Sequence, residues 1–318
     1  MNISVVGCGY WGKNLIRNYF ELGCLYSVSD SNIEVAEDFA HMYKCKPQSL
    51  EEIISDSRID GVVISAPAEH HKEIACKLLA ANKNIFIEKP LAMNVAEAVL
   101  IKEALNKSSG LLMVGHLLQF HPGFILLKQL VHSGNYGSIN NIISRRSSFG
   151  RIRRSEDVLW SFAPHDISMI LGLAKSSPKE VLRIDHSFLQ SKLSDISFLN
   201  LKFDGYTANI SVSWIHPRKE QQLIVVCDKA ILLFDDTLPW SEKVSVKSYE
   251  LSNIGNEIAL IDKETKFFPI EDNIEPLKLE CEHFIGLIQG KKENITDINE
   301  GINVLKVLEQ AKLLDSIS

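Results

Sequence analysis

The chain has 318 residues, more than one hydrophobic core usually serves, so its length predicts two domains. Hydrophobic residues make up 45% and charged residues 23%, as in ordinary globular proteins, and the net charge of −6 argues against a general nucleic-acid binder. No apolar run approaches the roughly 18–20 residues of a membrane span, and a strand predicted from the first residues leaves no room for a signal peptide. The six cysteines have no C-x-x-C spacing, which favours reduced thiols. We therefore expect a cytoplasmic protein with no nucleic-acid or membrane partner.

Short apolar strands alternate with amphipathic helices through the first third of the chain. This alternation predicts an α/β domain with a doubly wound parallel sheet of the Rossmann type over residues 1–122. Ligands of such sheets bind at the carboxyl ends of the strands. Strands are predicted at residues 3–6, 25–29, 61–65, 84–87 and 111–114, and helices at 13–22, 33–43, 51–55, 70–81 and 94–107.

The first strand leads into a glycine-rich turn, Gly7-Cys8-Gly9-Tyr10-Trp11-Gly12, which matches the pattern G-x-G-x-x-G. One glycine allows a tight turn, one lets the backbone approach a pyrophosphate, and one lets the following helix pack closely on the strand. The second strand ends at Asp30, about where an acid that binds a ribose diol is expected. Because Ser31 rather than a basic residue follows, and an acid repels a 2′-phosphate, the sequence predicts NAD rather than NADP.

The other strand ends carry the remaining candidate ligands. The segments Ser65-Ala66-Pro67, Glu88-Lys89-Pro90 and Gly115-His116 each follow a buried strand and should line one crevice. The predicted cofactor-binding residues are Gly7, Gly9, Tyr10, Trp11, Gly12, Asp30, Ser31, Ser65, Ala66, Pro67, His70, Glu88 and Lys89.

Residues 123–318 have a different character, with strand-like runs rich in β-branched and aromatic residues. They predict an α+β domain with a large, open and mostly antiparallel sheet and one helical layer. One helix, beginning at Pro164, interrupts the strands, and the charged stretch 240–270 fits no element. Strands are predicted at 139–149, 181–190, 196–203, 207–215, 221–226 and 230–234, and further helices at 123–132, 275–289 and 299–315.

Two residues are candidates for proton transfer. Lys89, at the mouth of a parallel sheet, can stabilise an alkoxide, and a solvated lysine beyond a strand is the simpler alternative. His165 follows Pro164, which suits the first turn of a helix, so the positive helix end should keep the ring neutral and able to act as a general base. The alternative for His165 is a partial helix cap.

A dense basic run lies in this otherwise acidic chain, formed by Arg145, Arg146, Arg151, Arg153 and Arg154. Guanidinium groups bind phosphate and carboxylate oxygens in pairs, so a diphosphate-bearing or uronate substrate fits the run. A solvated loop or a subunit contact fits it equally. For His116, Gln119 and His121, which are further candidates, a structural role is the stronger alternative. No spacing of histidine, cysteine and acid resembles a metal site, so no metal is expected.

These features together resemble the Gfo/Idh/MocA oxidoreductase family over nearly the whole chain. The resemblance rests on the glycine motif, Asp30, Ser65-Ala66-Pro67 with His71 behind it, Glu88-Lys89-Pro90 and His165-Asp166. It implies a Rossmann domain, a second domain whose open sheet often joins subunits into dimers or tetramers, and hydride transfer between a nicotinamide and a sugar or polyol carbon. Lys89 and His165 match the family's catalytic lysine and histidine.

Two departures narrow this resemblance. Many members carry an acid four residues before the histidine, where this chain has Ser161, and their usual arginine-rich stretch is replaced here by residues 118–122. The run from Leu159 to Asp166 resembles instead the branch that oxidises the C3 hydroxyl of UDP-N-acetylglucosamine, or of its uronate, to a 3-keto sugar. Products of that branch are used to make amino sugars for lipopolysaccharide or lipid A.

The predicted activity is therefore NAD-dependent oxidation of a UDP-sugar by a homodimer or homotetramer. The alternatives are a free-sugar or inositol dehydrogenase, a keto-sugar reductase and, outside the enzymes, a non-catalytic NAD-binding regulatory protein. The presence of both Lys89 and His165 argues against the last. Lys89 and His165 are the predicted catalytic residues, and the predicted substrate-binding residues are Lys89, His116, Gln119, Arg151, Arg153, Arg154, Trp160 and His165.

Overall fold

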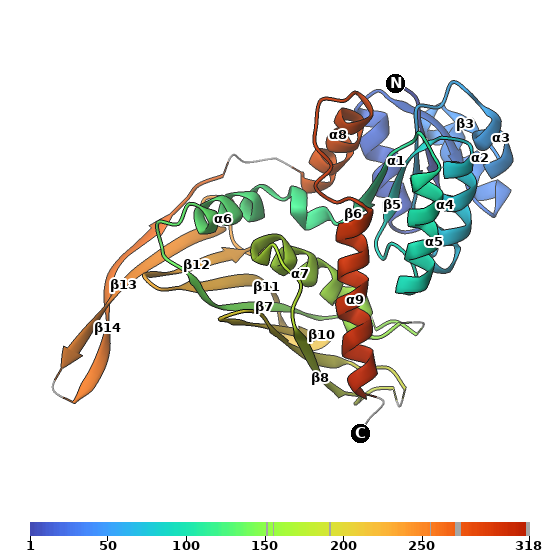
Figure 1. Ribbon diagram of the computed structural model, residues 1–318. Coiled ribbons are helices and arrows are strands. Elements are labelled where there is room, and N and C mark those ends of the chain that lie inside the picture. The colour runs from blue at the N-terminus through green and yellow to red at the C-terminus, as the bar shows by residue number, and fades with distance from the viewer. Residues whose placement is uncertain (151, 155, 191, 255, 271–274, 316–318) are drawn as a thin grey trace. The chain divides into compact units, whose positions relative to one another are not determined.

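The computed structural model of the chain describes residues 1–150, 152–154, 156–190, 192–254, 256–270 and 275–315 (Figure 1). The chain forms two compact units. The first unit consists of Met1–Phe120 and Glu275–Lys306, and the second of the described residues of His121–Ile274 and Val307–Ser318. Within the described residues, no helix has both the length and the apolar character needed to cross a membrane.

The first unit is built on a six-stranded sheet whose neighbouring strands are all parallel. The strand order is β3-β2-β1-β4-β5-β6, so the order reverses between β1 and β4. The doubly wound Rossmann sheet predicted from the sequence is thereby confirmed. Its strands are β1 (Ile3–Val6), β2 (Leu25–Ser29), β3 (Lys46–Pro47), β4 (Gly61–Ile64), β5 (Asn84–Glu88) and β6 (Leu112–Gly115).

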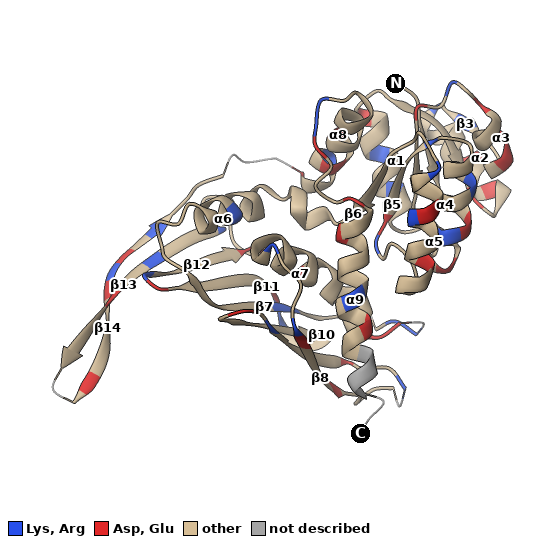
Figure 2. Ribbon diagram, viewed as in Figure 1, with Lys and Arg blue, Asp and Glu red and all other residues tan. Residues whose placement is uncertain are grey.

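Three helices of the first unit, α2, α3 and α5, start at residues that supply side-chain caps. Asn32 and Asn94 accept the first free N–H groups of α2 and α5, and Ser49 forms a capping box with Glu52 at α3. Helices α1, α4 and α8 (Pro276–Ile288) have no side-chain cap. Figure 2 shows charged residues of both signs on α4 and α5, which pack side by side. The elements are α1 (Gly12–Glu21), α2 (Ile33–Tyr43), α3 (Leu50–Ser55), α4 (His71–Ala80), α5 (Val95–Asn106) and the 3₁₀ turns η1 (Ala68–His70) and η2 (Leu117–Phe120).

The division into units differs from the predicted domain boundary at the C-terminal end of the chain, because residues from 275 onward return to the first unit. Helix α8 (Pro276–Ile288) buries Leu277, Cys281 and Phe284 in the same core as Leu15 and Phe86. Helix α9 (Ile298–Asp315) begins in the first unit and ends in the second. The apolar face of α8 covers surface of the Rossmann unit that would otherwise be exposed to water.

The second unit contains an eight-stranded sheet in the order β14-β13-β12-β11-β7-β10-β9-β8. Every neighbouring pair is antiparallel except β7 and β10, which confirms the large, mostly antiparallel sheet. Helices α6 (Pro122–His132) and α7 (Val158–Ala174) pack on this sheet. The strands are β7 (Ile139–Phe149), β8 (Glu180–His186), β9 (Ile196–Lys202), β10 (Thr207–Ser213), β11 (Ile215–Cys227), β12 (Ala230–Asp235), β13 (Val244–Ile254) and β14 (Glu257–Phe267).

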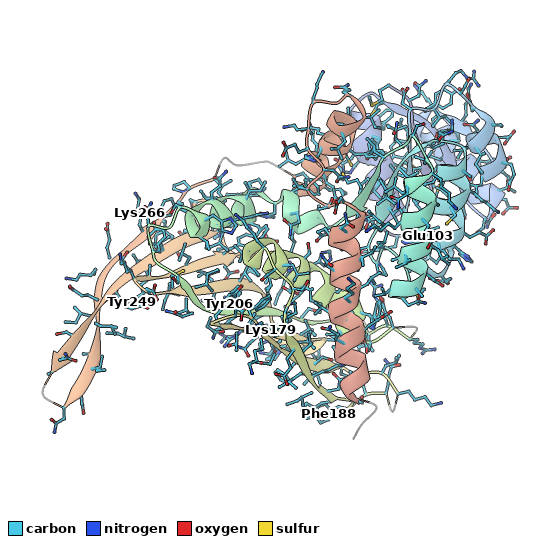
Figure 3. The ribbon with its side chains drawn as sticks, in the orientation of Figure 1. Glu103, Lys179, Phe188, Tyr206, Tyr249 and Lys266 are labelled. Atoms are coloured by element: carbon cyan, nitrogen blue, oxygen red, sulfur yellow. The ribbon has the colours of Figure 1, made fainter. Side chains whose placement is uncertain are left out.

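The stretch 240–270, which the sequence left unassigned, contains the long hairpin of β13 and β14. Its outer part pairs only within itself, since β12 pairs with β13 no further than Ser248. Tyr249 fixes the base of this outer part, because its hydroxyl donates to the Cys227 carbonyl at 2.6 Å (Figure 3). Most side chains of the outer part are exposed. The hairpin therefore has no single buried face, which removes the apolar alternation by which a strand is recognised.

Candidate active site

The glycine turn after β1 is shaped by its contact with the loop after β4. Gly7 has φ +100°, and a Cβ there would lie 2.6 Å from the Ala66 nitrogen. A Cβ on Gly12 would lie 1.9 Å from the Gly7 carbonyl oxygen. The Ser65 hydroxyl donates to that same carbonyl at 2.7 Å. Two of the three motif glycines are therefore required by the backbone packing where the strand order reverses, which is where such sheets bind ligands.

Gly9 differs from the other two glycines because a Cβ there would meet nothing within 4 Å. It is exposed at the start of α1, whose N-terminal end lacks a side-chain cap. Free N–H groups at a helix N-terminus attract phosphate. The open space at Gly9 and the uncapped helix fit the diphosphate of a dinucleotide. Tyr10 and Trp11 flank this space and are 68% and 38% exposed.

Asp30 lies directly after β2 and is held beside the glycine turn. Its Oδ2 accepts the Cys8 backbone N–H at 2.8 Å, and its Oδ1 accepts the Asn32 N–H at 3.0 Å. Ser31 is exposed next to it. The arrangement fixes a carboxylate near the turn, as the adenosine ribose of NAD requires, and a negative charge there disfavours a 2′-phosphate.

His71 ties the loops after β4 and β5 together. It is 1% exposed, and its two ring nitrogens lie 2.8 Å from the carbonyl oxygens of Ala66 and Pro90. Burial lowers the pKa of His71. His70, which the sequence proposes as a cofactor contact, is exposed at the N-cap of α4, so the two neighbouring histidines have different environments.

Glu88 and Lys89 lie at the carboxyl end of β5. Glu88 Oε1 accepts the Trp11 indole N–H at 2.6 Å, and Oε2 accepts the Lys89 backbone N–H at 3.2 Å. Burial raises the pKa of Glu88 to about 7, even though the Trp11 hydrogen bond and the Lys89 charge act in the opposite direction. The Lys89 side chain is half-buried. The carboxyl ends of β1, β2, β4 and β5 thus gather the predicted cofactor residues at one edge of the sheet.

His116 and Gln119 are more enclosed than a substrate-contacting role suggests. They are 2% and 4% exposed, and His116 Nδ1 lies 2.5 Å from Glu300 Oε2. His121, in the second unit, accepts the Gly123 N–H at Nδ1 and lies 3.0 Å from Asp236 Oδ1 through Nε2, which is a structural role as N-cap of α6.

The helix that carries His165 begins earlier than the sequence predicts. Helix α7 begins at Val158, where the Asp157 side chain accepts the Trp160 N–H at 2.9 Å, and Pro164 lies inside the helix. The half-buried His165 is therefore in the third turn rather than the first. The helix dipole acts mainly within one terminal turn, so it does not hold this ring neutral as predicted. The signal for the true start was Asp157, a favourable N-cap residue.

Helix α7 is fastened to the sheet by the residue next to His165. Asp166 is fully buried, accepts the Ser144 hydroxyl at 2.6 Å and pairs with Arg146 Nε at 2.8 Å. Arg146 is thus occupied by an ion pair within the second unit, which gives it a structural role. Because side chains alternate along a strand, Arg145 lies on the opposite face of β7. The Asp166 contacts instead hold the turn of α7 that presents His165.

The remaining predicted substrate residues lie around the start of α7. Arg151 falls outside the described residues. Arg153 and Arg154 are exposed, and Arg153 pairs with Glu156. Trp160 is half-buried in the first turn of α7. Over the part of the chain that the structure describes, no group of three or more histidine, cysteine or acidic side chains is arranged to hold a metal ion.

A doubly wound sheet, a glycine turn that leads into a helix without a side-chain cap, and an acid after β2 together define an NAD-binding Rossmann domain. Residues 1–116 match the oxidoreductase family with NAD-binding Rossmann fold, and residues 124–233 match the GFO/IDH/MocA C-terminal domain. The chain therefore belongs to the Gfo/Idh/MocA oxidoreductases and uses NAD as its cofactor.

Curated relatives are distant and differ in what they act on. The chain is 25% identical to 2,7-anhydro-N-acetylneuraminate hydratase from Escherichia coli over 64% of this chain and 59% of that protein, so the match spans less than two thirds of that relative. It is 24% identical to inositol 2-dehydrogenase from Rhizobium meliloti over 90% of this chain and 88% of that one.

Solved structures share the fold over the whole chain. UDP-N-acetylglucosamine 3-dehydrogenase GnnA from Acidithiobacillus ferrooxidans superposes with a TM-score of 0.82 at 20% identity, covering 99% of this chain and 97% of that one. The WlbA dehydrogenase from Bordetella pertussis, solved with NADH and UDP-GlcNAcA, gives 0.81 at 18% identity, covering 100% and 97%. At these identities the likeness establishes the fold.

Proposed function

We propose that the chain oxidises the C3 hydroxyl of UDP-N-acetylglucosamine, or of its uronate, to a 3-keto sugar with NAD as hydride acceptor. The observation that carries the proposal is that α7 is anchored to β7 through the buried Asp166, which gives the neighbouring His165 a fixed support. The chain shares its fold with two dehydrogenases, one named for UDP-N-acetylglucosamine and one solved with UDP-GlcNAcA, and this supports a UDP-sugar as the substrate class.

Each protein group has one task in this reaction. His165 takes the proton of the C3 hydroxyl as general base. Lys89 stabilises the negative charge that develops on that oxygen. The nicotinamide, when bound, accepts the hydride that leaves C3. The glycine turn and Asp30 hold the dinucleotide. The exposed Arg153 and Arg154 bind the substrate diphosphate or the uronate carboxylate, as guanidinium forks do.

A cyclitol is the second candidate substrate, because the inositol 2-dehydrogenase from Rhizobium meliloti aligns with 90% of this chain. The two candidates differ in charge, since inositol carries no phosphate for the arginines. A preference for the UDP-sugar therefore requires Arg153 or Arg154, whereas oxidation of inositol does not.

The test measures NADH formation from UDP-N-acetylglucosamine, its uronate, myo-inositol and glucose. We expect a UDP-sugar to give the highest kcat/KM. His165→Ala and Lys89→Ala should each lower kcat by at least about 100-fold, the usual contribution of a positioned acid–base group. His41→Ala and Lys107→Ala, both at exposed positions outside the proposed site, are the matched controls. Equal turnover of inositol, or near-normal turnover by His165→Ala, would refute the assignment.

We further propose that the second-unit sheet joins two copies of the chain. The face of the sheet that carries Arg145 has a groove of about 680 Å³. Leu182, Ile184 and Phe198 line it and are 46%, 61% and 42% exposed. Exposed apolar side chains gathered on one face are typical of a protein interface.

A further inference from the structure

A buried acid lies in the first unit without a hydrogen-bond partner. Glu280, on α8, has no exposed surface, and neither of its carboxyl oxygens has a partner within the described part of the chain. An unpaired buried carboxylate is strongly disfavoured relative to its neutral form. Burial without a partner therefore favours the neutral form of Glu280 and raises its pKa well above the usual range.

Helix packing brings Glu280 toward Glu88. The rings of Phe86 and Phe284 contact each other, with centroids 5.8 Å apart. Glu280 lies one helical turn before Phe284 on the same face of α8, and Glu88 lies two residues after Phe86 on the same face of β5. The Phe86–Phe284 contact thus holds the two acids on the same side of the sheet, near enough for the charge of Glu88 to raise the pKa of Glu280.

The surroundings of Glu280 and Glu88 shift the pKa of both carboxyl groups. Burial, followed by the charge of Glu88, raises the pKa of Glu280 well above its usual range. Burial raises the pKa of Glu88 to about 7, although its contacts with Trp11, Lys89 and His116 lower that pKa. Titratable neighbours face the pair from several elements: Lys89 and His116 face Glu88, and Tyr19 and Cys281 face Glu280.

Glu88 is also linked directly to the cofactor turn. Its Oε1 accepts the indole N–H of Trp11, the N-cap residue of α1, at 2.6 Å. A charged acceptor strengthens this hydrogen bond, so the ionised Glu88 holds Trp11 more firmly than the neutral acid does. NADH brings two negative charges on its diphosphate to the same turn and has no positive ring charge to offset them.

We propose that Glu88 is a positioning residue whose buried carboxyl group, hydrogen-bonded to Trp11, takes up a proton when NADH binds at the glycine turn. The added negative charge and the exclusion of water both favour the protonated acid. Because binding consumes a proton, linkage requires NADH affinity to fall as pH rises through neutrality, by up to about tenfold per pH unit if uptake is complete. The inference rests on the NAD assignment and does not depend on the proposed substrate.

Calorimetry of NADH binding in buffers of different ionisation enthalpy counts the protons exchanged. Burial raises the pKa of Glu88 to about 7, so the carboxyl of the unmodified free protein is about half protonated at pH 7. We therefore expect a net uptake of up to about half a proton at pH 7, rising toward one proton at pH 8, and a dissociation constant that increases between pH 6 and pH 8. No uptake, or proton release, overturns the proposal even if every variant fails to fold. Failure to bind NADH at all would instead overturn the cofactor assignment, and a wrong substrate leaves the measurement unchanged.

Three variants locate the proton. Glu88→Gln should abolish uptake and flatten the pH dependence of NADH affinity. Glu280→Gln should preserve both, because burial favours the neutral form of Glu280, which the amide imitates. Trp11→Phe keeps an aromatic ring but removes the hydrogen bond that lowers the pKa of Glu88. The pKa of Glu88 should therefore rise, and the pH range over which NADH affinity falls should shift to higher pH. Three results would contradict the proposal. They are proton uptake that persists in Glu88→Gln, proton uptake that is lost in Glu280→Gln, and a shift of the pH dependence to lower pH in Trp11→Phe.

Discussion

Alanine at Gly12 and alanine at Gly9 should affect different properties of the protein, its stability and its cofactor affinity. The Gly12 methyl would lie 1.9 Å from the Gly7 carbonyl oxygen, a backbone atom that cannot rotate away. The Gly9 methyl would meet no protein atom within 4 Å, and Gly9 is not among the glycines with positive φ. Gly12→Ala should therefore lower stability, whereas Gly9→Ala should lower only cofactor affinity.

The magnitude for Gly12→Ala is a balance of two terms. Alanine gains about 0.5–1 kcal/mol in helix propensity. Forcing an extra methyl group into packed structure costs typically about 1–3 kcal/mol, and a contact of 1.9 Å lies at or beyond the upper end. A net loss of about 2 kcal/mol corresponds to a melting temperature lower by roughly 4–8 °C for a domain of about 150 residues.

Gly9→Ala should leave the melting temperature of the free protein unchanged within error. Its methyl group projects into the space proposed for the diphosphate, so the dissociation constant for NAD should rise at least about tenfold, equivalent to about 1.4 kcal/mol. Differential scanning calorimetry without cofactor and titration calorimetry with NAD separate the two effects. Normal NAD affinity in Gly9→Ala would refute the placement of the diphosphate, and normal stability in Gly12→Ala would refute the packing argument.

Two further predictions concern the second unit. Asp166→Asn leaves the buried Arg146 without its counter-charge and should destabilise the protein by about 3–5 kcal/mol in thermal unfolding, whereas Asp262→Asn, at an ion pair that is at least half exposed, should change little. A comparable loss of stability in both variants would mean that burial of the ion pair does not determine how much its removal destabilises the protein. Ile184→Glu places a charge on the proposed interface and should shift the molar mass from light scattering toward the monomer. An unchanged mass would remove this face from the contact.

Much of the Rossmann unit could be read from the sequence because its signals are local. Buried parallel strands are short continuous apolar runs, and each predicted strand lies within one residue of an observed one. The glycine spacing and the acid after the second strand mark the cofactor turn, since only glycine fits where the Gly7 and Ala66 backbones touch. Such features depend on neighbours along the chain or on backbone geometry that every such sheet repeats.

The elements that the sequence misjudged depend on partners far away in the chain. Pro164 looks like a helix start, yet Asp157 begins the helix earlier, and contacts with the sheet support a helix that includes the proline. Arg146 looks like a ligand for phosphate, but its counter-ion Asp166 is 20 residues away, on the helix that packs against β7. Local propensity is weaker than these tertiary contacts, so the sequence pattern alone gave the wrong assignment.

By itself the sequence determined the class of fold, the cofactor turn and the identity of the lysine and histidine candidates. Only the tertiary structure decided that α8 returns to the first unit, because a helix with one apolar face packs on whichever surface leaves least of that face in water. The same return buries Glu280 on the side of the sheet where Glu88 is also buried, and nothing in the residues around either acid indicates it. The properties of an ionisable group are set by what surrounds it in space, and folding brings those surroundings from 192 residues away along the chain.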